Sequence, residues 1–188
     1  GCKILRHDIG SLHDLRKNGP RQHPLRTMHQ IKSGTWRQTC ALTDDGRAFL
    51  SRNDSKYDLI LFALPDSLTL VSGASQLRLE SYLFTEESIR AARDHLTDEG
   101  VFAMYNYYRE SWLINRLAGT VEEVFGHTPC LDQFTAYQSL AAITVGKDAG
   151  NAVCAEGAVW DRASIAAAGQ AIPVPAVDDR PSLFELTD

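Results

Sequence analysis

Apolar runs and helix-like patterns alternate through the middle of the chain. A continuous apolar run from Leu59 to Leu64 lies between polar residues 56–58 and turn residues 65–67, and a second run extends from Val101 to Tyr105. Short apolar runs bounded by turn signals are typical of strands buried on both faces of a parallel sheet. The pattern predicts a third strand near Gln138 to Val145.

The segments between these strands have the apolar spacing of amphipathic helices. Thr85 is a suitable N-cap and is followed by two glutamates, which are favourable in a first helical turn, and Gly100 is expected to end this helix. A second helix is predicted from Ser111 through Val124, and a short one within Val159 to Ala168. The order strand, helix, strand, helix, strand predicts an α/β fold with a mainly parallel sheet and flanking helices.

The first forty residues lack this regularity. A short strand is expected from Cys2 to Ile9 and a helical turn from Ser11 to Lys17, and the stretch from Gly19 to Gly34 has the composition of a loop. At the other end of the chain, residues 173–181 are punctuated by prolines, which predicts an extended tail.

Charge divides the chain at nearly the same place as the hydrophobic pattern. The net charge of -5 hides eight Lys and Arg against two Asp and Glu in residues 1–40, and eleven against twenty-two in the remainder. A chain of 188 residues that is 44% hydrophobic and 23% charged fits one globular domain and excludes wholesale disorder. We therefore divide it into a basic, poorly patterned N-terminal segment, residues 1–40, and an α/β domain with an extended tail, residues 41–188.

Several function classes lack their sequence signals. The chain has no glycine-rich nucleotide fingerprint of the GxGxxG or GxxxxGKS/T type and no GxSxG elbow. No apolar run approaches the ~20 residues needed to cross a bilayer, and no signal-peptide pattern is present. Trp36 is the one aromatic residue of the basic segment, so no nucleic-acid partner is expected. Because the chain begins with Gly1, we expect further sequence upstream in the complete protein.

The cysteines have neither CxxC spacing nor a Cys/His pairing at zinc distances. We interpret them as thiols of a reducing compartment and leave one disulfide pair open. We interpret the histidines of the first forty residues as solvated surface residues, so no metal site is expected. The four cysteines are Cys2, Cys40, Cys130 and Cys154.

Candidate binding residues lie at the ends of two predicted strands and in one predicted turn. Asp66 comes after the first buried strand, Tyr105 and Asn106 end the second, and Asp45-Gly46 forms a turn. Ligands of open α/β sheets bind beyond the carboxyl ends of strands, where an acid, an amide and aromatic rings suit a nitrogenous, partly aromatic molecule. Each feature has an ordinary alternative: Asp66 as a turn cap, the tyrosines as packing residues, and Asp45-Gly46 as a common turn pair.

Several motifs occur in the order and spacing of one enzyme family. DDGRAFL at residues 44–50, followed by KYDLI at 56–60, resembles the DGRxFL…YDVI passage of the spermidine synthase family. Residues 83–102 and 134–147 are similar to later passages of that family. The resemblance covers residues 44–147. It implies the Rossmann-like fold of S-adenosylmethionine-dependent methyltransferases, no prosthetic group, and decarboxylated S-adenosylmethionine or S-adenosylmethionine as co-substrate.

One subgroup of the family gives the nearest pattern. ALPD at residues 63–66, YNYYRE at 105–110 and PAVDDRP at 175–181 look most like bacterial domains joined to multi-spanning membrane proteins. This resemblance implies transmembrane segments of a parent protein as partners and a cytoplasmic-facing position at the inner membrane. It also implies that the first strand of the fold is missing here, so that a homodimer or a swapped segment would complete the sheet.

The resemblance also assigns roles in binding and catalysis. Asp45 and Gly46 would contact the adenine of the co-substrate or of methylthioadenosine, and Asp8 would stand at the ribose-binding acid. Asp66 would match the second acid of the family's DSSDP loop. The first acid of that loop, which takes the proton of the attacking amine, falls on Ala63. An alanine cannot act as a general base.

Three functions stay open on this basis. The first is aminopropyl transfer to a polyamine, with Asp66 as the remaining acid and with Asn106, Tyr105 and Tyr137 binding the substrate. The second is methyl transfer on the same fold, which needs positioning more than a base. The third is a noncatalytic ligand-sensing or structural domain of a membrane protein, which the alanine at position 63 and the missing glycine loop favour.

Overall fold

The computed structural model describes six stretches of the chain. Among the positions singled out above, Asp8, Asp45, Asp66 and Tyr137 lie outside the described residues, as do the strand and the helical turn expected before residue 18. The described residues are 25–30, 36–41, 46–63, 79–108, 110–133 and 140–181.

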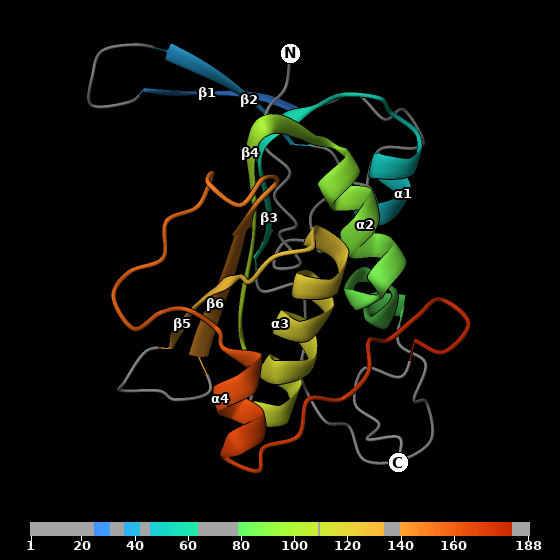
Figure 1. Cartoon of the computed structure of the whole chain (residues 1–188). Helices are drawn as coiled ribbons and strands as arrows, with labels where there is room; N and C mark the ends of the chain where they lie inside the picture. The colour runs from blue at the N-terminus through green and yellow to red at the C-terminus, as the bar shows by residue number, and fades with distance from the viewer. Residues whose placement is uncertain are drawn as a thin grey trace.

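A mixed sheet of four strands forms the centre of the α/β domain, in the order β3-β4-β6-β5 (Figure 1). The strands β3 and β4 are parallel, and β6 runs antiparallel to both of its neighbours. The strands are β3 (Tyr57–Ala63), β4 (Leu96–Tyr107), β5 (Cys130–Gln133) and β6 (Leu140–Gly146). The predicted α/β class is confirmed.

The prediction of a mainly parallel sheet holds only in part, since one of the three strand pairings among the described residues of this sheet is parallel. Six residues separate β5 from β6, which is too short for the crossover that a parallel pair requires. β6 therefore returns as the second strand of a hairpin and inserts between β4 and β5. The sequence pattern missed β5 because this strand has four residues, of which two are polar and exposed.

The helices cover one face of this sheet. Thr85 caps α2 as predicted, and its side chain accepts a hydrogen bond from the Ser88 N–H at 3.4 Å. Helix α2 packs on β4 and α3 packs on β6 (Figure 1). The helical elements are α1 (Gly46–Ser51), the 3₁₀ helix η2 (Leu79–Phe84), α2 (Glu86–Asp94), α3 (Ser111–Phe125) and α4 (Arg162–Ala167). The helices predicted after Thr85, from Ser111 and within Val159 to Ala168 correspond to α2, α3 and α4.

Helix α2 ends before Gly100, which corrects the predicted boundary. Its C-cap is His95, whose ring nitrogens lie 2.7 Å from the carbonyl oxygens of Ala91 and Asn53. Gly100 lies inside β4, where a Cβ would stand 2.9 Å from the Tyr57 carbonyl oxygen. The glycine there permits close approach of the neighbouring strand rather than ending a helix.

The core lies between the sheet and the helices. Alternate strand residues such as Phe62, Phe102 and Ile143 point toward the helices and are buried. The other face of the sheet is less covered, because Leu59 at its β3 edge is 52% exposed and Tyr107 is 48% exposed. The prediction that the first strand is buried on both faces is therefore wrong.

A separate two-stranded antiparallel sheet precedes the main sheet. It pairs β1 (Leu25–Gln30) with β2 (Trp36–Ala41). Residues 25–30 were expected to belong to a loop, so this expectation is wrong. The stretch LRTMHQ has no clear alternation of apolar and polar residues, and its pairing is visible only in the folded chain.

After β6 the chain returns along the domain as a C-terminal strap, which we define as residues 154–181. Cys154 forms a disulfide with Cys130, which decides the pair left open and corrects the expectation of thiols for these two cysteines. Beyond α4 the strap runs past α3 and α2, where the Ala176 carbonyl accepts a hydrogen bond of 2.8 Å from the Glu86 N–H (Figure 1). The strap thereby connects the two sides of the helical layer.

None of the helices within the described ranges combines the length and the apolar character that crossing a bilayer demands.

Candidate functional site

The carboxyl ends of β3 and β4 lie side by side at one edge of the sheet. Ala63, the last residue of β3, is in register with Tyr105, and β4 continues to Tyr107. Helix α3 begins at Ser111 from this edge (Figure 1). The edge is therefore bordered by two strand ends and a helix N-terminus, which is where ligands of α/β sheets bind.

Two buried side chains at this edge carry unused hydrogen-bond donors. Asn106 is 3% exposed, and its Oδ1 accepts a hydrogen bond of 2.8 Å from the Tyr107 N–H. Its Nδ2 has no partner in the part of the chain that the structure describes. The hydroxyl of Tyr108, which is 2% exposed, likewise has none within those ranges. An unpaired buried donor costs about 1–3 kcal/mol, so two of them at a strand end favour a ligand site.

Burial raises the pKa of the Tyr108 hydroxyl. The phenol therefore stays neutral at physiological pH and can donate a hydrogen bond. Because residues 106 and 108 are two apart in extended chain, their side chains leave the strand on the same side. Together the amide and the phenol can hold an oxygen or a neutral nitrogen acceptor, but neither can take a proton from an ammonium group.

The other two positions at the edge face the opposite side of the sheet. Tyr105 precedes Asn106 directly, so these two predicted substrate-binding residues point to opposite faces. Ala63 is in register with Tyr105 and shares its face. A methyl group thus occupies the position where the resemblance implies the proton-accepting acid. A substrate would have to pass over the strand ends to reach both faces.

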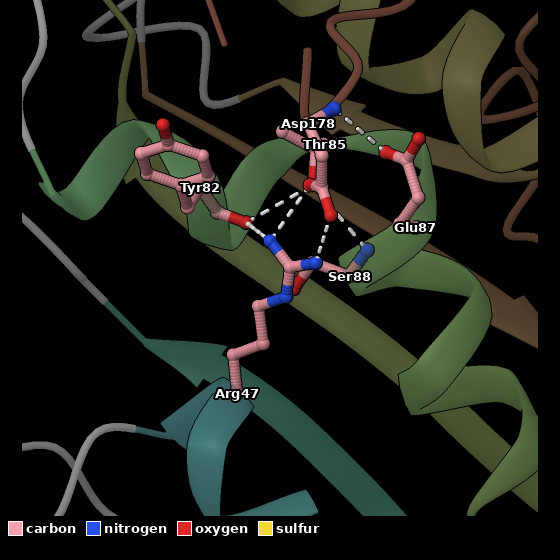
Figure 2. Close-up of polar contacts among 6 residues, drawn as sticks. All are labelled: Arg47, Tyr82, Thr85, Glu87, Ser88 and Asp178. Carbon is pink, nitrogen blue, oxygen red and sulfur yellow. Dashed lines mark hydrogen bonds and ion pairs between the residues drawn. The ribbon is translucent and has the colours of Figure 1, made fainter. Parts of the chain in front are cut away.

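Gly46 is buried and begins α1, and the next residue is the centre of a second polar cluster. The Arg47 guanidinium binds both carboxylate oxygens of Asp178, with Nη1 2.7 Å from Oδ1. The Thr85 hydroxyl lies 2.8 Å from the same Oδ1, and the Glu87 carboxylate accepts a hydrogen bond of 3.0 Å from the Asp178 N–H. Figure 2 shows these contacts converging at the N-terminus of α2. We call Arg47, Thr85, Glu87 and Asp178 the Arg47 cluster.

The Arg47 cluster joins α1, α2 and the C-terminal strap. The hydrogen bonds from Arg47, with a smaller contribution from Thr85, hold the pKa of Asp178 below its usual range. Sequence reasoning missed this cluster, although both the DGR motif and the DDRP tail were noted. An ion pair between residues 131 positions apart has no local signal in a single sequence. The contacts of these residues with one another make the cluster a tie between elements.

A groove of about 440 Å³ lies elsewhere, between the C-terminal half of α3 and α4. Its lining includes Trp160 and Arg162. Arg162 already forms ion pairs with Glu122 and Glu123, and its guanidinium lies 5.3 Å from the centre of the Trp160 ring. The positive charge of Arg162 is therefore already paired within the protein and is not available to a ligand in the groove. Within the described ranges, no group of three or more His, Cys, Asp or Glu side chains is suited to a metal ion.

The solved structures that are similar to this chain include two spermidine synthases. One is a spermidine synthase in complex with the transition-state analogue AdoDATO, with 17% identity and a TM-score of 0.41. The other is the spermidine synthase from Thermotoga maritima, with 16% identity and a TM-score of 0.41. Each match covers 78% of this chain and 46% of the other, so the chain spans about half the length of these enzymes.

No protein-family model matches the chain, and no curated protein is similar to it. The similarity to spermidine synthases is a similarity of backbone fold at low sequence identity. A similar fold does not establish a similar activity. Function must therefore be argued from the residues at the sheet edge.

Proposed function

We propose that this chain is a spermidine synthase-like domain that binds an S-adenosylmethionine-derived nucleoside and an amine at the carboxyl edge of β3 and β4. We further propose that aminopropyl transfer by this domain is slow, because Ala63 replaces the acid. The observation that carries the proposal is the pair of buried donors on Asn106 and Tyr108, which have no partner among the described residues and lie at the same sheet edge as that alanine.

The chemistry of aminopropyl transfer explains why position 63 matters. The amine nitrogen attacks the methylene beside the sulfonium, the carbon–sulfur bond breaks, and methylthioadenosine leaves. At neutral pH the amine is an ammonium ion without a lone pair, so a base must take its proton first. A positioned base contributes roughly 10²–10⁴-fold to the rate. Ala63 provides no base, and the only acid that the resemblance offers in its place is Asp66.

Restoring the acid tests the catalytic part of this proposal. In Ala63→Asp, formation of methylthioadenosine from decarboxylated S-adenosylmethionine and putrescine is expected to rise at least tenfold over the wild type, in line with the worth of a positioned base of roughly 10²–10⁴-fold. Ala63→Asn is the matched control, because it adds a side chain of the same shape without a proton acceptor. Equal rates in the wild type and both variants would contradict the assignment of position 63.

A noncatalytic ligand-sensing domain is the second candidate, and the same alanine favours it. Calorimetric titration with methylthioadenosine and with S-adenosylmethionine separates the candidates from a purely structural role. Binding by the wild type with no turnover in Ala63→Asp would favour a sensor. No heat with either nucleoside would exclude both the enzyme and the nucleoside sensor. The transmembrane partner segments and the homodimer stay predictions.

A further inference from the structure

The disulfide between Cys130 and Cys154 fastens the start of the C-terminal strap to the sheet. It joins the first residue of β5 to a residue 24 positions later, with the Cα atoms 5.2 Å apart. Cys130 is 5% exposed, whereas Cys154 is only partly buried. A reductant can therefore reach the bridge from the strap side.

The bridge stands next to a short run of backbone pairing. The Leu131 N–H donates to the Ala158 carbonyl at 2.6 Å, and the Trp160 N–H donates to the Pro129 carbonyl at 3.1 Å. Trp160 is 1% exposed, and its indole N–H donates to Asn115 Oδ1 at 3.3 Å. The strap thus adds to the free edge of β5 and then inserts a tryptophan into the core.

The strap is exposed between the bridge and Ala158. Residues 155–157 are exposed, and so is Val153, which is 93% exposed. The disulfide is therefore the covalent constraint that keeps the strap beside β5. Disulfides form and persist in oxidising compartments, and thiols stay reduced in the bacterial and eukaryotic cytosol.

We propose that Cys130–Cys154 is a redox-dependent lock on the C-terminal strap and that this domain works in an oxidising compartment. This proposal is an alternative to the cytoplasmic-facing position that the sequence resemblance implies, which stays a prediction. The inference does not depend on the nucleoside site, since it rests on the bridge and the strap alone.

Unlocking is an ordinary thiol–disulfide exchange. A thiolate of an external dithiol attacks the Cys154 sulfur, the S–S bond breaks, and Cys130 leaves as a thiolate that takes a proton. The second thiol of the dithiol then attacks the mixed disulfide and releases Cys154. Two electrons pass to the protein, which gains two thiols, and the reductant becomes a disulfide.

The location is tested on the complete protein in its own cells. Cells are quenched with acid and denatured in the presence of N-ethylmaleimide, after which disulfides are reduced and labelled with a second maleimide. Mass spectrometry then reads the peptides of Cys130 and Cys154. The second label on both cysteines is expected. The first label on both would overturn the assignment to an oxidising compartment.

The lock is tested by hydrogen exchange on the purified chain. Reduction with dithiothreitol is expected to speed exchange of the Leu131 and Trp160 amides by about tenfold or more, because local opening becomes easier. Cys154→Ser should exchange like the reduced protein and melt about 10 °C lower than the oxidised wild type. Cys40→Ser is the control and should behave like the wild type. Equal exchange of oxidised and reduced protein at these two amides would overturn the lock.

Discussion

Two polar regions of the domain differ in how fully their groups are paired. In the Arg47 cluster, both carboxylate oxygens of Asp178 and its backbone N–H have partners. At the carboxyl edge of β3 and β4, the Asn106 amide and the Tyr108 hydroxyl are more deeply buried yet have unused donors in the described part of the chain. Folding stability explains the first region but not the second. Unpaired buried donors are costly, which favours a ligand as their partner.

The residues that belong to the sequence motifs are of two kinds, structural and binding. Arg47 belongs to the DGR motif of the resemblance, but its contacts with Asp178 serve to connect α1 and the strap. Asn106 has fewer contacts and is the better candidate for binding. One residue of a family motif can therefore stabilise the fold, while a residue of another motif binds the ligand.

The Arg47 cluster should lose the most stability when one of its partners is replaced. Asp178→Asn is expected to lower the free energy of unfolding by about 1–2 kcal/mol, since it removes charge-assisted hydrogen bonds from a partly exposed pair. Asp179→Asn is the matched control, because it removes the same charge from an adjacent exposed acid. Urea denaturation measures both. Equal effects of the two variants would show that charge alone, rather than the Arg47 cluster, is responsible.

A pH series sharpens this result. The folded-state pKa of Asp178 lies below its unfolded value of about 3.9, so its stabilisation is present above that pH and is lost as pH falls through the folded pKa. The stability difference between the wild type and Asp178→Asn should therefore be constant from about pH 7 to 5 and shrink below about pH 4. Chemical denaturation at each pH measures it. A difference that persists unchanged at pH 3 would contradict an ionised Asp178 as the source.

The smallest expected stability effect concerns the unpaired region. Tyr108→Phe removes a hydroxyl that has no partner among the described residues and should leave the free energy of unfolding within about 0.5 kcal/mol of the wild type, or raise it. Tyr57→Phe is the control: Tyr57 is buried and its hydroxyl donates to Asn53 Oδ1 at 3.3 Å, so loss of this hydroxyl should cost about 0.5–1.5 kcal/mol. If Tyr108→Phe proves the more destabilising of the two, the Tyr108 hydroxyl has a partner and the comparison fails.

The sequence predicts the local parts of this fold. Thr85 and the glutamates after it identify the start of α2 because capping depends on neighbouring residues. The apolar runs locate β3 and β4, and the spacing from Ser111 locates α3. The direction of β6, the Cys130–Cys154 bridge and the contact of Arg47 with Asp178 depend on which distant segments meet. The hydrophobic periodicity of a single sequence does not indicate which distant segments contact each other.

The sequence predicts where the candidate site lies but not how its side chains are arranged. The strand ends at Ala63 and Asn106 are visible in the sequence, and the structure places them at one edge of the sheet. The sequence pattern did not indicate that Tyr105 and Asn106 face opposite sides, because the ends of β4 were not fixed. It also did not indicate that the Tyr108 hydroxyl has no partner within the described ranges, since this depends on the distant segments that pack around it.

The most direct measurement is a nuclear magnetic resonance titration of the side-chain amides with methylthioadenosine. We expect the Asn106 side-chain NH₂ resonances to shift with added nucleoside. The Asn115 resonances should stay in place, because its Nδ2 lies 3.3 Å from both Gln170 Oε1 and the Ala171 carbonyl oxygen. A nucleoside that binds without moving the Asn106 resonances, or that moves no resonance at all, would contradict the assignment of the site.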